Sequence, residues 1–129
     1  MKKALLLFAG AIMMVLAVSC TKATTYEIYN GTSGIGIYDV KAYEYSGSTL
    51  INYFDVGFLN ADANSGTIEA AKEANKVQIA FKFAPGGDVY TTAEYYSLKT
   101  GGHTMILIED NTQIYGGKKG TETVGLAIK

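Results

Sequence analysis

The sequence has no arginine and no tryptophan, and only one cysteine, one histidine and one proline among its 129 residues. Arginine is the side chain best suited to binding phosphate and nucleic-acid backbones. Its absence, with 11 lysines against 12 acidic residues, argues against DNA, RNA or anionic lipid headgroups as partners. The single histidine, His103, cannot form a zinc site without thiol or carboxylate ligands. No sequence spacing identifies a nucleophile that His103 could activate as a general base. We therefore expect no cofactor, no metal and no enzymatic activity, and we interpret His103 as a surface residue.

The first twenty residues are the most informative segment. Lys2 and Lys3 precede an unbroken apolar run over residues 4–18, which Ser19 and Cys20 follow. A basic start, a short apolar run and a small residue are the three parts of a secretory signal peptide, and the run is too short to span a bilayer comfortably. The sequence thus predicts export from the cytoplasm.

The residues Ala17-Val18-Ser19-Cys20, with Leu16 just upstream, resemble the lipobox of bacterial lipoproteins. The resemblance implies cleavage before Cys20 and acylation of that cysteine, so that a lipid anchor holds the protein to a membrane. It divides the chain into a cleaved signal peptide (1–19), a short lipidated tether (20–23) and a domain (24–129). Residues 21–24 lack the acidic export tag of many Bacteroidetes surface lipoproteins. We expect an outer-membrane protein that faces the periplasm, with the cell surface as the alternative.

The mature part has 110 residues once the 19 of the signal are removed, which is the size of one ordinary domain. Its alternating apolar residues predict an all-β fold, an antiparallel β-sandwich of seven or eight strands that resembles immunoglobulin-like or transthyretin-like domains. A change of buried register predicts a β-bulge near residues 38–39, and we expect Phe54, Val56 and Phe58 to be buried. Residues 67–74 are interpreted as an edge strand or one helical turn. The other strands are expected at 24–29, 35–45, 50–59, 76–83, 89–98, 104–109, 112–115 and 124–128.

Two short motifs are interpreted as turns. Asn60, Asp62, Asn64 and Glu69 form an oxygen-rich segment, but the glycine and glutamate of a calcium loop are misplaced. The glycine-rich residues 31–36 lead into another strand rather than into a helix, so we expect a hairpin turn and not a phosphate-binding loop.

Tyrosine is the conspicuous excess, with ten residues, all in the mature part. Its ring offers flat apolar surface with a hydroxyl at the rim, which suits stacking on sugars or anchoring a protein partner. Tyr43 and Tyr45 share a strand face with Lys41 and are the best candidates for an exposed binding platform. We predict a lipid-anchored, non-catalytic protein-interaction or structural module. The alternatives are a glycan-binding module that uses exposed tyrosines and, last, a small periplasmic hydrolase.

Overall fold

The computed structural model of the protein describes residues 22–116 and 121–127. The predicted signal peptide and Cys20 lie outside this part of the chain. The elements within it are β1 (Thr25–Asn30), β2 (Ile37–Ser46), β3 (Thr49–Leu59), β4 (Ile68–Glu69), β5 (Lys76–Lys82), β6 (Tyr90–Thr92), β7 (Tyr96–Ser97), β8 (His103–Ile108), β9 (Gln113–Gly116), β10 (Thr121–Thr123) and the short helix α2 (Val124–Ala127). No helix among the described residues is long and apolar enough to cross a membrane.

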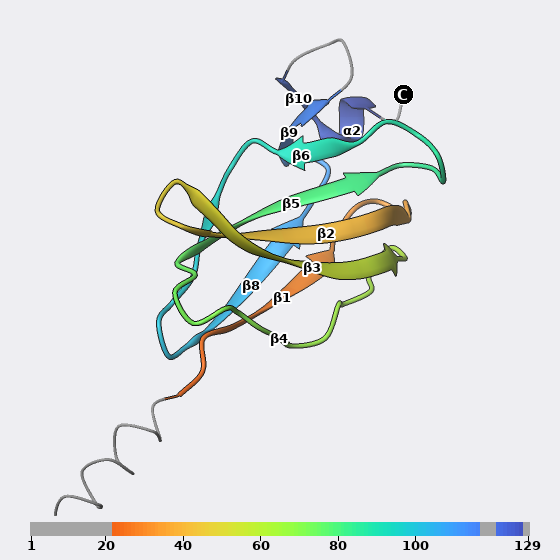
Figure 1. Ribbon diagram of the computed structural model, residues 1–129. Coiled ribbons are helices and arrows are strands. Elements are labelled where there is room, and N and C mark those ends of the chain that lie inside the picture. The colour runs from red at the N-terminus through yellow and green to blue at the C-terminus, as the bar shows by residue number, and fades with distance from the viewer. Residues whose placement is uncertain (1–21, 117–120, 128–129) are drawn as a thin grey trace, which may run out of the picture.

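The strands form two sheets that pack as a β-sandwich, which confirms the predicted fold class (Figure 1). Sheet A has the order β4-β1-β8. Sheet B has the order β10-β9-β6-β5-β2-β3, and β7 pairs with β5 beside this path. The pairing is antiparallel except between β1 and β8, which run parallel. Because β1 and β2 lie in different sheets, residues 31–36 cross between the layers, and the expected hairpin turn there is wrong.

The core lies between the sheets and follows the predicted alternation. In β1 the buried side chains are Tyr26, Ile28 and Asn30, and in β5 they include Ile79 and Phe81. Apolar residues on alternate positions of facing strands fill the space between the layers, which is how a sandwich excludes water. The same alternation leaves the intervening residues on the outer faces.

Glu44 and Asn30 are among the polar side chains that are fully buried in this core, and both are satisfied within it. The Glu44 carboxylate accepts hydrogen bonds from the Tyr26 hydroxyl (2.6 Å), the Ala71 backbone N–H (2.7 Å) and the Asn52 amide (3.2 Å). The Asn30 amide donates to the carbonyls of Ile35 and Leu59. Buried polar groups are tolerated when they are paired, and these two tie β1 of sheet A to β2, to β3 and to the connecting loops.

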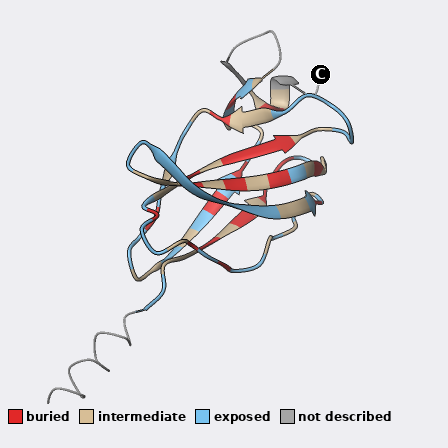
Figure 2. Cartoon of the chain, viewed as in Figure 1, coloured by how far each residue is buried: buried red, intermediate tan, exposed pale blue. Residues whose placement is uncertain are grey.

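The prediction that Phe54, Val56 and Phe58 of β3 are buried is wrong for the two phenylalanines. Phe54 is 44 % exposed and Phe58 is 53 % exposed, while Val56 is half-buried (Figure 2). β3 is the edge strand of sheet B, and the three strands of sheet A leave its inner face partly uncovered. At Gly57 the backbone has φ of 89° and the register with β2 shifts, so that Phe58 packs against the ring of Tyr38 instead of the core.

The remaining differences concern short elements. The bulge predicted near residues 38–39 is present, because the register of β2 shifts there against both of its neighbours. The edge strand predicted within residues 67–74 is β4. The single strand expected over residues 89–98 is divided into β6 and β7, and the strand expected over residues 124–128 is wrong, since residues 124–127 form α2.

Candidate functional site

The outer face of β2 gathers the most distinctive side chains of the described chain. Strand alternation directs Ala42 and Glu44 into the core and therefore leaves Lys41, Tyr43 and Tyr45 on the opposite face. The neighbours on β3 and β5 complete this surface, because Tyr53 lies opposite Tyr43.

Four tyrosines, which we call the tyrosine row, occupy one half of this face: Tyr43, Tyr45, Tyr53 and Tyr95. The ring centroids of Tyr45 and Tyr95 are 5.2 Å apart in an edge-to-face arrangement, and those of Tyr43 and Tyr53 are 6.2 Å apart. Partial burial and, to a lesser extent, the neighbouring tyrosines raise the pKa of the Tyr45 hydroxyl.

Lysines flank the tyrosine row at both ends. The Lys76 ammonium lies 5.1 Å from the centre of the Tyr95 ring, and the Lys41 ammonium lies 5.8 Å from the centre of the Tyr53 ring. Both distances fit cation–π contacts. The Tyr53 ring is 56 % exposed, so it remains accessible beside Lys41.

The other half of the face carries two ion pairs around a hollow. The Lys41 ammonium lies 3.8 Å from the Asp55 carboxylate, and the Lys82 ammonium lies 3.0 Å from the Asp39 carboxylate. These four residues line a hollow of about 370 Å³, which we call the charged hollow; Tyr43, Ala80 and Val89 line it too. Its two cations and two anions balance, so the hollow has polar groups without a net formal charge.

Asp39 reaches the hollow through an unusual backbone conformation. Its φ is 49°, in the left-handed region that non-glycine residues rarely adopt. It sits in the bulge where the register of β2 shifts against both neighbours. Bulges and strained residues are concentrated at functional sites, where they re-aim a side chain. Here the bulge brings the carboxylate beside Lys82.

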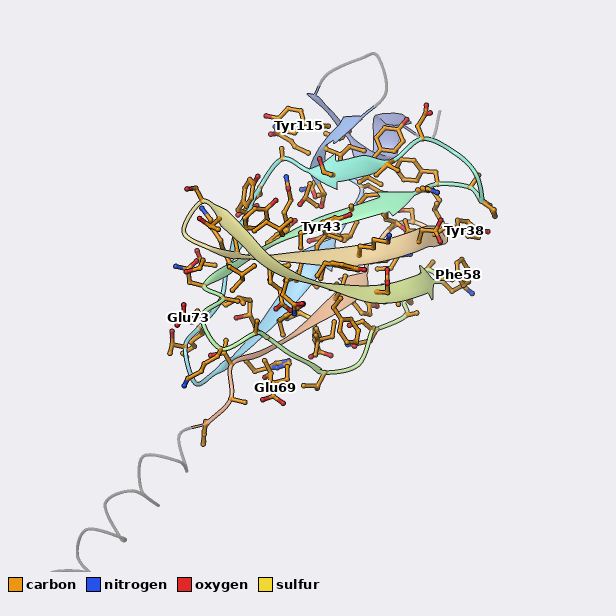
Figure 3. All side chains as sticks on the ribbon, in the orientation of Figure 1. Tyr38, Tyr43, Phe58, Glu69, Glu73 and Tyr115 are labelled. Atoms are coloured by element: carbon orange, nitrogen blue, oxygen red, sulfur yellow. The ribbon has the colours of Figure 1, made fainter. Side chains whose placement is uncertain are left out.

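The structure therefore brings the two predicted platform residues, Tyr43 and Tyr45, together on one outer face with Lys41. Figure 3 shows Tyr43 over the middle of sheet B, whereas Tyr115 lies near the side of the sheet formed by β9 and β10. Sequence reasoning missed other members of the surface, among them Tyr53, Tyr95 and Lys82. Strand alternation alone cannot identify these residues, because they come from β3, from the loop before β7 and from β5, respectively.

Two other residues that are adjacent to the platform in sequence lie elsewhere. Glu44 is buried, and the exposed Asn52 donates a hydrogen bond to it from β3, so neither joins the tyrosines on the outer face. Asp39 and Glu44 lie on opposite sides of β2, since Asp39 lines the charged hollow and Glu44 is buried in the core.

His103 has partners that the sequence did not reveal. Its Nδ1 lies 2.8 Å from the Thr25 hydroxyl, and its Nε2 lies 2.8 Å from a Glu27 carboxylate oxygen. Asn64 also donates to Glu27, and the hydrogen bonds from His103 and Asn64 lower the pKa of the Glu27 carboxyl. A hydroxyl, an imidazole and a carboxylate in this order resemble a hydrolytic triad. These residues lie side by side on β1 and β8, however, and they do not line the charged hollow.

A second hollow, of about 510 Å³, opens beside β8 and β9. Its walls include Met105 and Leu107 together with Glu94 and Glu109. Burial and the two carboxylates raise the pKa of Tyr96, which also lines it, to about 12. This hollow is acidic and holds one tyrosine, whereas the outer face of β2 combines clustered rings with both signs of charge.

The oxygen-rich segment does not form a cluster. The Asp62 carboxylate accepts a hydrogen bond from Tyr29, the Asn60 amide oxygen accepts one from the Ala61 N–H, and Asn64 donates to Glu27. No group of three or more potential metal-ligating side chains occurs within residues 22–116 and 121–127. The interpretation of the segment as a polar turn agrees with these contacts.

Comparison with known proteins gives evidence about the fold alone. No protein-family model matches the chain, and no curated protein matches it. An NMR structure of a protein from Eubacterium rectale is similar in structure, with a TM-score of 0.53 and 16 % sequence identity. The alignment covers 76 % of this chain and 93 % of that one. The chain is thus a small all-β protein whose architecture is similar to that of a protein from Eubacterium rectale.

Proposed function

We propose that this protein is a lipid-anchored, non-catalytic binding module of a bacterial envelope, and that it binds a neutral glycan along the outer face of β2. One observation carries the proposal. Successive outward residues of β2 present two tyrosine pairs and then two Lys–Asp pairs. Of the alternatives drawn from the sequence, glycan binding needed clustered and accessible rings, and this surface provides them.

The chemistry of the surface suits sugars. A pyranose ring has flat faces of C–H groups and a rim of hydroxyl groups, and a tyrosine ring can cover such a face while its own hydroxyl remains available for hydrogen bonds. Carboxylates accept hydrogen bonds from hydroxyl groups and ammonium groups donate to them. Because Lys41 and Lys82 are balanced by Asp55 and Asp39, a neutral chain is favoured over a charged one.

The extent of the surface suits a chain rather than a single sugar. Tyr45 lies six positions along the strand from Asp39, and at about 3.4 Å per strand residue this distance is about 20 Å. The bulge at Asp39 shortens this path slightly. Binding without catalysis is proposed because each carboxylate of the hollow faces a lysine, whereas glycoside hydrolysis uses two carboxylates that flank the scissile bond.

The lipid anchor is the second part of the proposal. It rests on the lipobox-like residues 16–20, and the tether of four residues from Cys20 would reach only about 14 Å. Intact mass and membrane fractionation of the native protein beside Cys20→Ala test it. We expect a mass increase that corresponds to acyl chains and recovery in the membrane fraction, and both should be lost in the variant. An unmodified, freely secreted native protein would contradict the anchor.

Glycan binding is testable with defined probes. The probes are cellohexaose, maltohexaose and chitohexaose, with hexagalacturonate as the charged comparison. We expect measurable binding of at least one neutral chain and weaker binding of hexagalacturonate. Tyr53→Ala removes an exposed ring of the tyrosine row and should weaken binding at least about tenfold, or about 1.4 kcal/mol.

Tyr115→Ala is the matched control for this experiment. Tyr115 is 49 % exposed, close to the exposure of Tyr53, but it lies on β9, three strands from β2. Its removal should change affinity by less than about twofold. Equal losses in the two variants, or no binding of any of the neutral chains, would count against the proposal.

Protein interaction through β3 is the second candidate function. Leu50, Ile51 and Phe54 are exposed on this edge strand, and exposed edges invite a partner strand. The register with β2 shifts near Leu50 and again near Gly57, which leaves only residues 52–55 regular between the two irregularities. Such irregularities protect an edge from pairing, so we rank glycan binding first. A photo-crosslinking residue at Phe54 that gave no discrete adduct in intact cells would remove this candidate.

A further inference from the structure

The charged hollow lies where the outer face of β2 ends. Along β2 the order is Tyr45, Tyr43, Lys41 and Asp39, so a chain that lies over the tyrosine row runs into the hollow. The connection between β5 and β6, residues 83–89, follows Lys82 and contributes Val89 to the lining of the hollow. Figure 1 shows that this connection extends beyond the end of sheet B. Val89 thus borders the hollow beside Lys82, at the end of the face away from the tyrosine row.

A hollow with a wall at one end treats a chain end differently from an interior unit. An interior sugar must leave the site in two directions, and the wall obstructs one of them. A terminal sugar needs only one exit and presents one more free hydroxyl group than an interior unit does. This hydroxyl can donate to a carboxylate and accept from an ammonium at the same time.

Asp39 and Lys82 are arranged to bind such a hydroxyl. Their carboxylate and ammonium are 3.0 Å apart, and the Lys82 side chain is mostly covered, with 24 % exposure, while the Asp39 side chain is 59 % exposed. Lys82 is therefore held in place, and Asp39 presents acceptor oxygens to the solvent side. The positive φ of Asp39 is a conformation that glycine would adopt with less strain.

On the basis of the proposed glycan function, we propose that the charged hollow is a subsite for the terminal sugar of a neutral chain. The protein then recognises chain ends, with Asp39 and Lys82 binding the free hydroxyl group and the tyrosine row holding the preceding units. Val89 and residues 83–89 exclude a continuing chain.

The test compares the hexasaccharide that wild type binds best with two capped forms of it. One form is a methyl glycoside at the reducing end, and the other is methylated on the terminal hydroxyl at the non-reducing end. We expect one of the two caps to weaken binding by the full-length protein in detergent at least about tenfold, because the cap removes a hydrogen bond to a charged group. If neither cap changes the affinity, the end-binding subsite is wrong, although the glycan function stands. If none of the neutral chains binds, both proposals are wrong.

A pair of variants separates the role of the Asp39 carboxylate from its backbone strain. Asp39→Gly removes the carboxylate and relieves the positive φ, so it should fold at least as stably as wild type while it loses the discrimination between capped and uncapped chains. Asp62→Gly is the matched control, because Asp62 has a φ of 62° and lies outside the hollow. It should keep full discrimination. Retention of discrimination in a folded Asp39→Gly variant would overturn the assignment.

Discussion

The buried hydrogen bond between Tyr26 and Glu44 gives the sharpest prediction about stability. Both side chains are fully buried, and the Tyr26 hydroxyl donates to Glu44 Oε2 over 2.6 Å. Tyr26→Phe keeps the ring and opens no large cavity, but it leaves that oxygen without its tyrosine donor. A hydrogen bond to a charged group contributes about 1.5–3 kcal/mol. We therefore expect the free energy of unfolding to fall by about 2 kcal/mol, which corresponds to a decrease in Tm of about 8 °C for a domain of this size.

Urea denaturation followed by circular dichroism measures this change, and the slope of the transition should stay constant. Tyr115→Phe is the control, because its ring is 49 % exposed and its hydroxyl lies at the surface. Its stability should lie within about 0.5 kcal/mol of wild type. If Tyr26→Phe were as mild as Tyr115→Phe, the carboxylate would not depend on this donor, and the account of how the two sheets are joined would fail.

Two further predictions concern pH and packing. Burial and the neighbouring Glu44 raise the pKa of Tyr26. Burial and nearby carboxylates raise the pKa of Tyr96 to about 12. Above the ordinary tyrosine pKa of about 10 the unfolded chain loses these protons first, so stability should fall by roughly 1.4 kcal/mol per pH unit per tyrosine between pH 10 and 12. Tyr96→Phe should reduce that slope in alkaline denaturation, and an unchanged slope would refute the assignment. Gly116→Ala places a methyl group against the ring of Tyr90, and we expect a loss of about 1–3 kcal/mol in thermal unfolding, whereas a neutral result would contradict the packing there.

Local patterns predicted the fold class because alternation reports burial directly. Ile79 and Phe81 alternate with polar residues and lie in the core, as expected. The same rule failed at Phe54, because it cannot reveal that sheet A leaves the inner face of β3 partly uncovered, and at Phe58, because it cannot reveal the register shift at Gly57. Burial of an edge strand depends on what the opposite layer provides, and that is a property of the whole chain.

The candidate site likewise contains some residues that the sequence could predict and others that it could not. Tyr43 and Tyr45 share a face by period alone, and the sequence places them together. Their partners Tyr53 and Tyr95 depend on strand register, and the contact between Asp39 and Lys82 depends on a bulge whose effect on side-chain direction the sequence does not specify. A buried role for Glu44 was also beyond the sequence, since nothing local distinguishes a carboxylate that faces the core from one that faces water.

The most direct test of the central claim is the response of the tyrosine ring resonances to a neutral hexasaccharide in two-dimensional NMR of the mature protein in detergent micelles. The account predicts that the signals of Tyr43, Tyr45, Tyr53 and Tyr95 shift together on saturation while that of Tyr29, on sheet A, stays unchanged. Shifts confined to other tyrosines, or none in the presence of bound sugar, would contradict the assignment of the outer face of β2 as the binding surface.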